Sequence, residues 1–119
     1  MDIFFLFLFL IIIYICFQLK NILTWDKVNI GLGHYFRRRH EFIVFASKGK
    51  RKLNSKNIPD IWRVKRIAGG KYPAQKPVEI FELMLLASAD KDDLVCDPFL
   101  GSGSAAIAAL KRNCRFMGC

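Results

Sequence analysis

A glycine-rich segment at residues 97–104 holds the residues best suited to ligand binding, in the order Asp97-Pro98-Phe99-Leu100-Gly101-Ser102-Gly103-Ser104. Apolar residues precede it and an alanine-rich stretch follows it, so we expect a strand, a turn and a helix in that order. Gly101 and Gly103 carry no Cβ, which lets the backbone approach a nucleotide-like ligand, and the helix would expose its N-terminal amides. Because such turns are common, the turn alone is weak evidence.

Other nucleotide and metal sites fit the sequence less well. Ala106 replaces the third glycine of the dinucleotide fingerprint, which leaves an NAD site as a poorer alternative. The GxxxxGK[ST] loop of nucleoside triphosphatases is absent. The four cysteines form no CxxC pair, so no zinc site is predicted. Cys96 lies in an apolar strand pattern and is expected to be buried.

The elements around this turn predict a βαβ unit. Helical spacing of apolar residues predicts a helix over 78–89, with Pro77 at its start. A strand at 94–96, a helix at 103–112 and a strand from 115 to 119 follow. This order implies a parallel sheet with helices on its faces, in an α/β fold.

Upstream of the helix, three further strands are predicted. They are expected at 21–25, at 41–47 with both faces buried, and at 61–67 with imperfect alternation. Glycine and polar residues mark loops at 26–34 and 48–60.

Positive charge is concentrated in the middle of the chain. The formal net charge is +9, and residues 27–76 hold fourteen Lys or Arg against two acids, Glu41 and Asp60. Such density suits a polyanion, because Lys and Arg displace counterions from phosphates. A solvated basic face is the alternative.

Residues 3–17 form an unbroken apolar run that has three interpretations. A secretory signal is disfavoured, because Asp2 replaces the usual basic region and no small-residue cleavage site follows. The run is shorter than the roughly 20 residues that cross a bilayer comfortably, although membrane anchoring stays open. Its Phe and Ile content also suits a buried strand. We therefore expect an apolar N-terminal segment over 1–20 and a separate, partial domain over 21–119.

Two segments in a fixed order resemble the S-adenosylmethionine-dependent amino-methyltransferases of DNA. Tyr72-Pro73-Ala74-Gln75-Lys76-Pro77, a helix, a strand and then residues 97–104 are similar to the family's HPTQKP and DPFxGSG segments. The stretches at 22–27 and 40–49 are also similar, so the resemblance covers residues 22–118. It implies a partial Rossmann-like class I methyltransferase fold, a three-layer sandwich with a mostly parallel sheet.

The resemblance implies a cofactor site for S-adenosyl-L-methionine. Asp97 would face the methionine amino group, while Phe99, Leu100 and the segment from Gly101 through Ser102 and Gly103 to Ser104 would shape the pocket. Gln75, Lys76 and Pro77 would line the methionine end. Tyr72 and Ala74 depart from the family's His and Thr. Structural alternatives are that Asp97 only caps the turn and that Lys76 is a solvated helix flank.

The resemblance also implies double-stranded DNA as the substrate, with a base flipped out of the duplex. The residues expected to grip phosphates are Arg37, Arg38, Arg39, Lys48, Lys50, Arg51 and Lys52. Trp62 lies among basic residues and could stack on a base, but a core position is the alternative.

No catalytic residue is predicted, because the family's (D/N/S)PP(Y/F/W) tetrapeptide is absent from this sequence. We expect the cofactor-binding part of a cytoplasmic N6-adenine or N4-cytosine methyltransferase that is inactive alone and needs a complementing segment. In the family's sheet order the strands bearing the missing chemistry would lie centrally, which leaves unpaired edges that residues 3–17 could fill. The competing hypotheses are a DNA-binding module without catalysis and a membrane-anchored basic protein.

Overall fold

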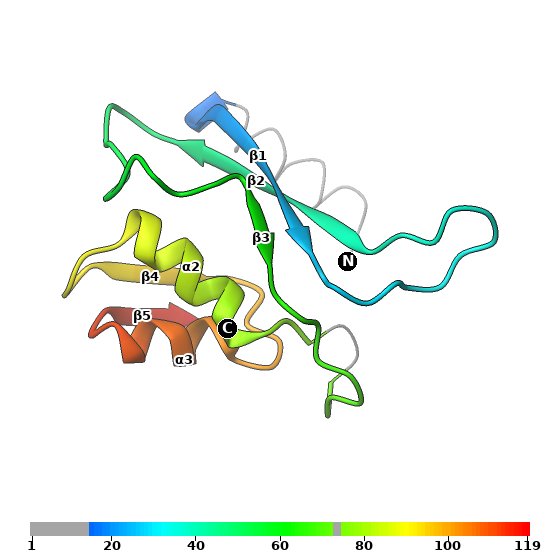
Figure 1. Cartoon of the computed structure of the whole chain (residues 1–119). Coiled ribbons are helices and arrows are strands. Elements are labelled where there is room, and N and C mark those ends of the chain that lie inside the picture. The colour runs from blue at the N-terminus through cyan, green and yellow to red at the C-terminus, as the bar shows by residue number, and fades with distance from the viewer. Residues whose placement is uncertain (1–14, 73–74) are drawn as a thin grey trace.

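Five strands and two helices make up the described part of the chain, residues 15–72 and 75–119 of a computed structural model (Figure 1). In chain order they are β1 (Gln18–Asp26), β2 (His40–Ser47), β3 (Ile61–Arg63), α2 (Val78–Ser88), β4 (Leu94–Asp97), α3 (Ser104–Lys111) and β5 (Arg115–Gly118).

The first three strands form one sheet in the order β2-β1-β3. β1 pairs with β2 antiparallel and with β3 parallel, and Thr24 lies opposite both Phe42 and Ile61. The strands predicted at 21–25 and 41–47 are confirmed. β3 ends at Arg63 although a strand to residue 67 was predicted, because β1 ends at Asp26 and offers no further strand to pair with.

The predicted βαβ unit is confirmed. β4 and β5 pair in parallel from Leu94 opposite Arg115 to Asp97 opposite Gly118, and α3 connects them. Each helix agrees with its predicted range to within one residue at either end. The local pattern therefore predicts this half of the described chain well.

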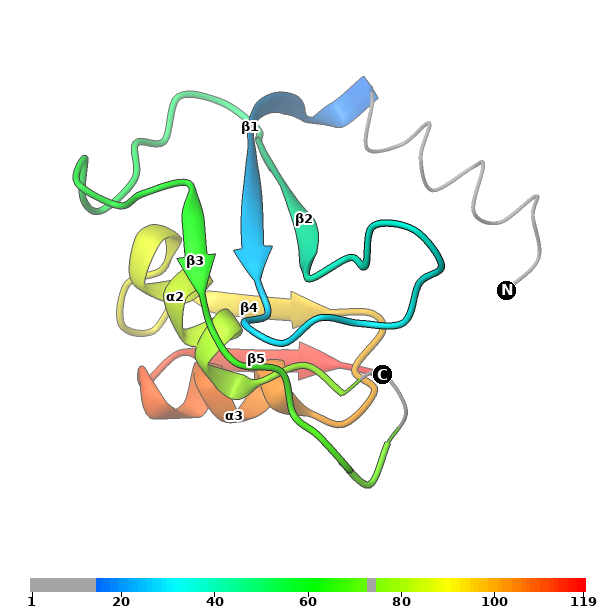
Figure 2. The same cartoon turned by 45° about the vertical axis from the view of Figure 1, so that its right-hand side comes forward.

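Helix α2 contributes to two cores and lies near β3 and α3 (Figure 2). Its residue Ile80, 1% exposed, packs with Trp25, Trp62 and Val64 of the first sheet region. Its residue Leu85 belongs to the second core, which is built from α3 and the β4–β5 pair. Burial of both faces of α2 is what fixes the first sheet against the βαβ unit.

Two burial predictions are wrong. In β2, which was expected to be buried on both faces, Phe42 and Val44 are 67% and 65% exposed. Cys96 is exposed, whereas Cys114 is buried. Each sheet packs against helices on one face only within the described residues, and alternate side chains of a strand point away from that face.

The strands do not form one continuous sheet, since the described residues contain a three-stranded and a two-stranded sheet that are not hydrogen-bonded to each other. The hypothesis that residues 3–17 replace a central strand concerns residues that, up to position 14, lie outside the described part. In residues 15–72 and 75–119, none of the helices is both long and apolar enough for a membrane crossing.

Candidate functional site

The turn between β4 and α3 is shaped by its two glycines. Gly101 and Gly103 have φ angles of 53° and 82°, in the left-handed region that glycine adopts at little cost. Gly103 is the residue just before α3, and its N–H donates to the Leu100 carbonyl at 3.0 Å. The glycines thus turn the chain sharply from the end of β4 into α3.

Asp97 stabilises this turn from its first residue. Its Oδ1 accepts a hydrogen bond from the Phe99 N–H at 2.9 Å. The Leu100 N–H donates to the Cys119 carbonyl at 3.1 Å, which ties the turn to the end of the chain's last strand. The structural role considered for Asp97, capping the turn, is therefore present, and the carboxylate still lines a cavity.

Ser104 connects the turn to the segment before α2. Its Oγ donates to the backbone carbonyl of Lys76 at 2.8 Å and lies 3.0 Å from the Ser102 Oγ. Ser104 is 4% exposed, so this hydrogen bond is shielded from water. Two segments that lie 28 residues apart in the sequence are therefore held side by side.

Together with Tyr72 and Phe81, the two segments line an open cavity of about 380 Å³. Its lining residues are Tyr72, Gln75, Lys76, Phe81, Asp97, Phe99, Leu100, Gly101, Ser102 and Ser104. Eight of these are among the ten residues predicted for the cofactor. The remaining two, Pro77 and Gly103, instead immediately precede α2 and α3. That these residues bind a cofactor stays a prediction.

The sequence did not indicate Phe81 as a site residue, and Tyr72 was noted only as a departure. Phe81 lies one helical turn after Pro77, on the side of α2 that continues the cavity wall. The helical spacing of apolar residues predicted a core position for Phe81, so the sequence carried no separate sign that it lines a cavity. Ala74, the second departure, lies outside the described residues.

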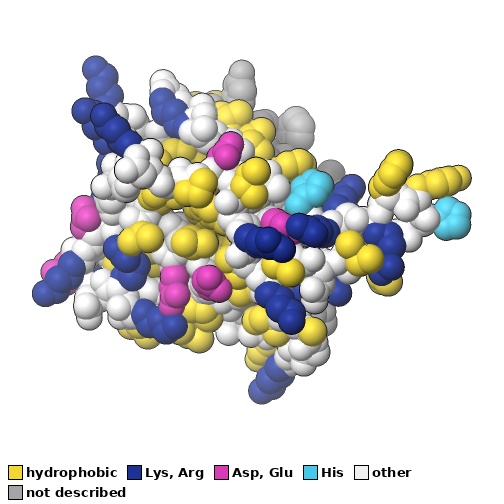
Figure 3. Space-filling model, in the orientation of Figure 1, with side chains coloured by type: hydrophobic (Ala, Val, Ile, Leu, Met, Phe, Trp, Pro, Cys, Tyr) yellow, Lys and Arg dark blue, Asp and Glu magenta, His cyan; other side chains and the backbone are white. Residues whose placement is uncertain are grey.

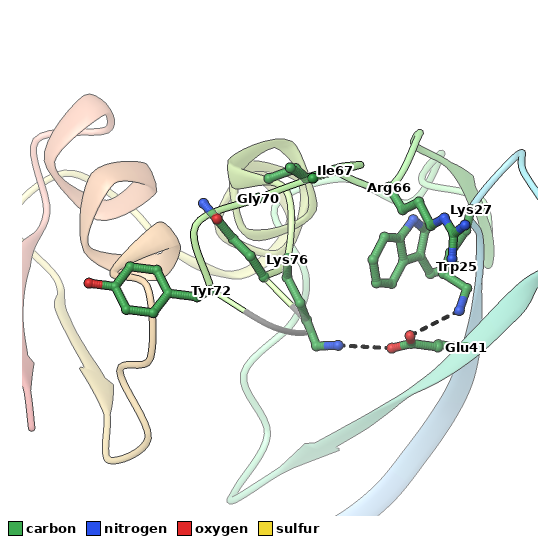
Figure 4. Close-up of a pocket in the computed structure, with 10 residues that line it drawn as sticks. Trp25, Lys27, Glu41, Arg66, Ile67, Gly70, Tyr72 and Lys76 are labelled. Carbon is green, nitrogen blue, oxygen red and sulfur yellow. Dashed lines mark hydrogen bonds and ion pairs between the residues drawn. The ribbon is translucent and has the colours of Figure 1, made fainter. Parts of the chain in front are cut away.

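A second cavity of about 300 Å³ adjoins the first and shares Tyr72, Gln75 and Lys76 with it (Figure 4). The first sheet contributes Trp25 and Glu41 to its wall, and Lys27 follows directly after β1. Arg66, Ile67, Gly69 and Gly70 complete the wall. Sequence reasoning assigned none of these residues a role. The sequence indicated only Trp25, Lys27 and Glu41, through their place in the family-like stretches at 22–27 and 40–49.

Glu41 of β2 lies between two lysines in this cavity (Figure 4). Its carboxylate oxygens are 3.1 Å from the Lys27 ammonium and 2.9 Å from the Lys76 ammonium. Partial burial of the carboxyl favours its neutral form, but hydrogen bonds from Lys76 and Lys27 outweigh this and hold the pKa of Glu41 below its ordinary value. Glu41 is therefore ionised at neutral pH and links both cations.

The side chain of Lys76 is held from a second direction by an aromatic ring. Its ammonium lies 5.4 Å from the centroid of Trp25, within the range of a cation–π contact. Trp25 is 3% exposed and donates from Nε1 to the Val64 carbonyl at 2.7 Å. Lys76 is accordingly not the freely solvated helix flank that was the alternative.

The predicted phosphate-binding residues fall into two groups. Arg37 to Arg39 lie in the loop before β2 and Lys48 to Lys52 in the segment after it, so the length of β2 separates them by about 25 Å. On the face in Figure 3, Lys and Arg side chains are spread over several parts of the molecule, some beside acids. Their role in DNA binding stays a prediction.

Some of these basic side chains already have protein partners. Arg39 binds both carboxylate oxygens of Asp26, at 2.8 and 2.6 Å, and Arg51 lies 3.2 Å from both Asp90 and Asp93. The hydrogen bond from Arg39 lowers the pKa of Asp26. A phosphate would have to compete with these carboxylates.

Trp62, which could have stacked on a base, is a core residue. It is 6% exposed, and its Nε1 donates to the Pro59 carbonyl at 2.8 Å.

Comparison with known proteins finds methyltransferases that are similar to this chain. The chain is 34% identical to Type II methyltransferase M2.MboI of Moraxella bovis, over 86% of this chain and 45% of that protein. It is 34% identical to Type II methyltransferase M.HhaII of Haemophilus parahaemolyticus, over 83% of this chain and 45% of that protein. The chain thus spans less than half the length of these relatives.

Solved structures share the fold. The M1.HpyAVI–SAM complex superposes with a TM-score of 0.77 at 24% identity, covering 97% of this chain and 62% of that one. The PvuII cytosine-N4-specific DNA methyltransferase gives 0.75 at 17% identity, covering 97% and 51%. The expected partial class I methyltransferase fold is confirmed. Because the family model described as DNA methylase, of the N6/N4 type, matches residues 4–119, this chain belongs to that family.

Proposed function

We propose that this chain is the cofactor-binding part of a site-specific DNA methyltransferase that uses S-adenosyl-L-methionine to modify N6 of adenine or N4 of cytosine. The observation that carries the proposal is the single cavity shared by residues 75–76 and 97–104. Both segments resemble the family's cofactor segments, and the Ser104 to Lys76 hydrogen bond holds them together.

The residues of this cavity fit S-adenosylmethionine. Its volume of about 380 Å³ lies within the range of small-molecule sites, roughly 300–1,000 Å³. The Asp97 carboxylate can pair with the ammonium of the ligand's amino-acid part, and Phe81 and Leu100 supply apolar wall. Gly101 leaves the backbone accessible. When bound, the cofactor supplies a methyl group activated by a positively charged sulfonium.

Duplex DNA is the proposed substrate because of the charge of the chain. The net charge of +9 favours association with phosphates, and a flipped base would have to reach the cavity. Arg37, Arg38 and Arg39 are proposed to contact phosphates at one end of β2, and Lys48, Lys50, Arg51 and Lys52 at the other. The protein is proposed to work in the cytoplasm, where the bacteria that carry the similar methyltransferases keep their DNA. Binding of DNA without chemistry is the second candidate, favoured by the same charge.

Catalysis is proposed to need a complementing polypeptide. Methyl transfer to an exocyclic amine requires acceptors that hold the amine and stabilise its developing positive charge. The (D/N/S)PP(Y/F/W) tetrapeptide that does this in the family is absent from the sequence. The separate β2-β1-β3 and β4-β5 sheets leave strand edges that such a segment could pair with.

Isothermal titration of the full chain with S-adenosylmethionine tests the cofactor assignment. We expect saturable binding that is lost in Asp97→Ala and retained in Glu79→Gln, which changes an exposed acid at the start of α2. Absence of binding at millimolar cofactor would contradict the assignment. A DNA mobility assay on the same chain, with and without cofactor, separates a methyltransferase part from a plain DNA-binding module.

A further inference from the structure

We propose that Glu41 is the positioning residue of the cofactor site: from β2 it holds Lys76, and through Lys76 it holds residues 75–77 against the turn at 97–104. The inference rests on the proposed cofactor function. Glu41 itself does not line the cofactor cavity, so any effect it has on the ligand must pass through a neighbour.

Lys76 is the neighbour that connects the two cavities. Its backbone carbonyl accepts the hydrogen bond from Ser104 at the start of α3, while its ammonium reaches Glu41 on β2 at 2.9 Å. One residue is thereby held by two elements that belong to different cores. If the ammonium is released from Glu41, residue 76 keeps only its backbone anchor to Ser104, and the cofactor wall at this point is held less firmly.

The Glu41 contact is better defined than an ordinary surface ion pair. Lys27, whose side chain is 15% exposed, holds the carboxylate from one side, and Lys76 holds it from the other. The Trp25 ring limits where the Lys76 ammonium can lie. Two donors and the strand backbone fix the position of the Glu41 carboxylate, so little further conformational entropy is lost when it binds Lys76. The carboxylate therefore fixes the position of the Lys76 ammonium.

Residues 75–77 depend on such contacts because they belong to no helix or strand. α2 begins only at Val78, with Pro77 immediately before it. Proline has no N–H to donate, so the backbone at this point offers fewer hydrogen bonds than a helix or strand. The Gln75 N–H donates to the Tyr72 carbonyl at 3.3 Å, and the Glu41–Lys76 pair adds a side-chain anchor from another element.

A double-mutant cycle on the full chain tests the proposal. Cofactor affinity is measured by isothermal titration for wild type, E41Q, K76M and E41Q/K76M. Because Lys76 lines the cofactor cavity, K76M can weaken binding directly. The coupling energy between E41Q and K76M is therefore the quantity that tests whether Glu41 acts through Lys76. We expect E41Q to weaken binding by about threefold to fivefold, the size of a partly exposed ion pair, and to have no further effect once K76M is present.

The Glu82–Lys111 pair is the matched control. It is a partly exposed ion pair of 2.6 Å that joins α2 to α3 and lies away from the cofactor cavity. E82Q and E41Q are both expected to lower the melting temperature slightly, but only E41Q should weaken cofactor binding. Unchanged affinity in E41Q, or equal effects of E41Q in the presence and absence of Lys76, would overturn the proposal.

Hydrogen exchange without cofactor provides a second readout. Amides of residues 75 and 76 should exchange faster in E41Q than in wild type or E82Q. If wild type fails to bind S-adenosylmethionine, the proposed function fails, and these exchange rates alone decide whether Glu41 positions the segment. Exchange that is identical in all three chains would reject the positioning role whatever the titration shows.

Discussion

Replacing Ser104 with alanine should separate the two segments that form the cofactor cavity. The change removes the Oγ that donates to the Lys76 carbonyl at 2.8 Å and contacts the Ser102 Oγ at 3.0 Å. Backbone conformation at this first position of α3 suits alanine as well as serine. The substitution therefore isolates the inter-segment hydrogen bond.

The expected cost follows from the burial of the bond. Ser104 is 4% exposed, and a hydrogen bond of this kind contributes about 0.5–1.5 kcal/mol to stability. We expect a loss of about 1 kcal/mol, because removing the Ser104 donor leaves the Lys76 carbonyl without this shielded hydrogen bond. For a chain of 119 residues the melting temperature should fall by roughly 4 °C, since the unfolding entropy is about 2.1 cal/mol/K per residue.

Thermal unfolding followed by circular dichroism measures this effect, and cofactor titration follows its consequence at the site. Ser88→Ala is the control, since Ser88 Oγ also donates to a carbonyl, that of Met84 at 2.7 Å, but within α2. Losing that bond should be neutral or slightly stabilising, because serine bonded back to its own helix competes poorly with alanine. If S104A melted like S88A and bound cofactor normally, the Ser104 bridge would have no organising role.

Three further outcomes are expected. Gly103→Ala should cost about 1 kcal/mol in chemical denaturation from its φ of 82° alone, because no atom lies within 4 Å of the added Cβ; a cost near zero would mean that the turn relaxes. Ala108→Leu, at a fully buried position between α2 and α3, should destabilise by about 1–3 kcal/mol, and an unchanged unfolding midpoint would contradict the packing described. The hydrogen bond from Arg39 lowers the pKa of Asp26 in the folded protein. The stabilisation from this pair is therefore present above pH 3.8, the ordinary pKa of Asp, and is lost as the pH falls through the lower pKa of the folded state. Asp26→Asn should remove this pH dependence from melting curves recorded in acid.

Local patterns predicted the elements whose contacts are close in sequence. The βαβ unit, the helix after Pro77 and the turn at 97–104 each follow from spacing within about a dozen residues. The end of β3 was overestimated because strand length depends on the partner strand, here β1, which local alternation does not reveal.

Burial was the least predictable property. Phe42 and Cys96 lie in apolar runs typical of strands covered on both faces, yet both are exposed within the described chain. Which face a layer covers is decided by distant segments, not by the run itself. The sequence of one strand alone therefore does not predict which of its faces is buried.

The cavity residues were predicted where they lie within the two family-like segments and missed where they lie outside them. Gln75, Lys76 and most of 97–104 line one cavity, as the resemblance implied. Glu41 is 35 residues from Lys76 in sequence, and the contact arises only when β2 is placed beside the start of α2. A charge in a strand pattern gives no sign of such a partner.

The central claim is that residues 75–76 and 97–104 form one site for S-adenosylmethionine. Titration of the ¹⁵N-labelled full chain with this cofactor, followed through backbone amide signals, tests it most directly. We predict that Lys76, Gly101, Ser102 and Gly103 shift together along one saturation curve. Shifts confined to one segment, or none at millimolar cofactor, would contradict the account.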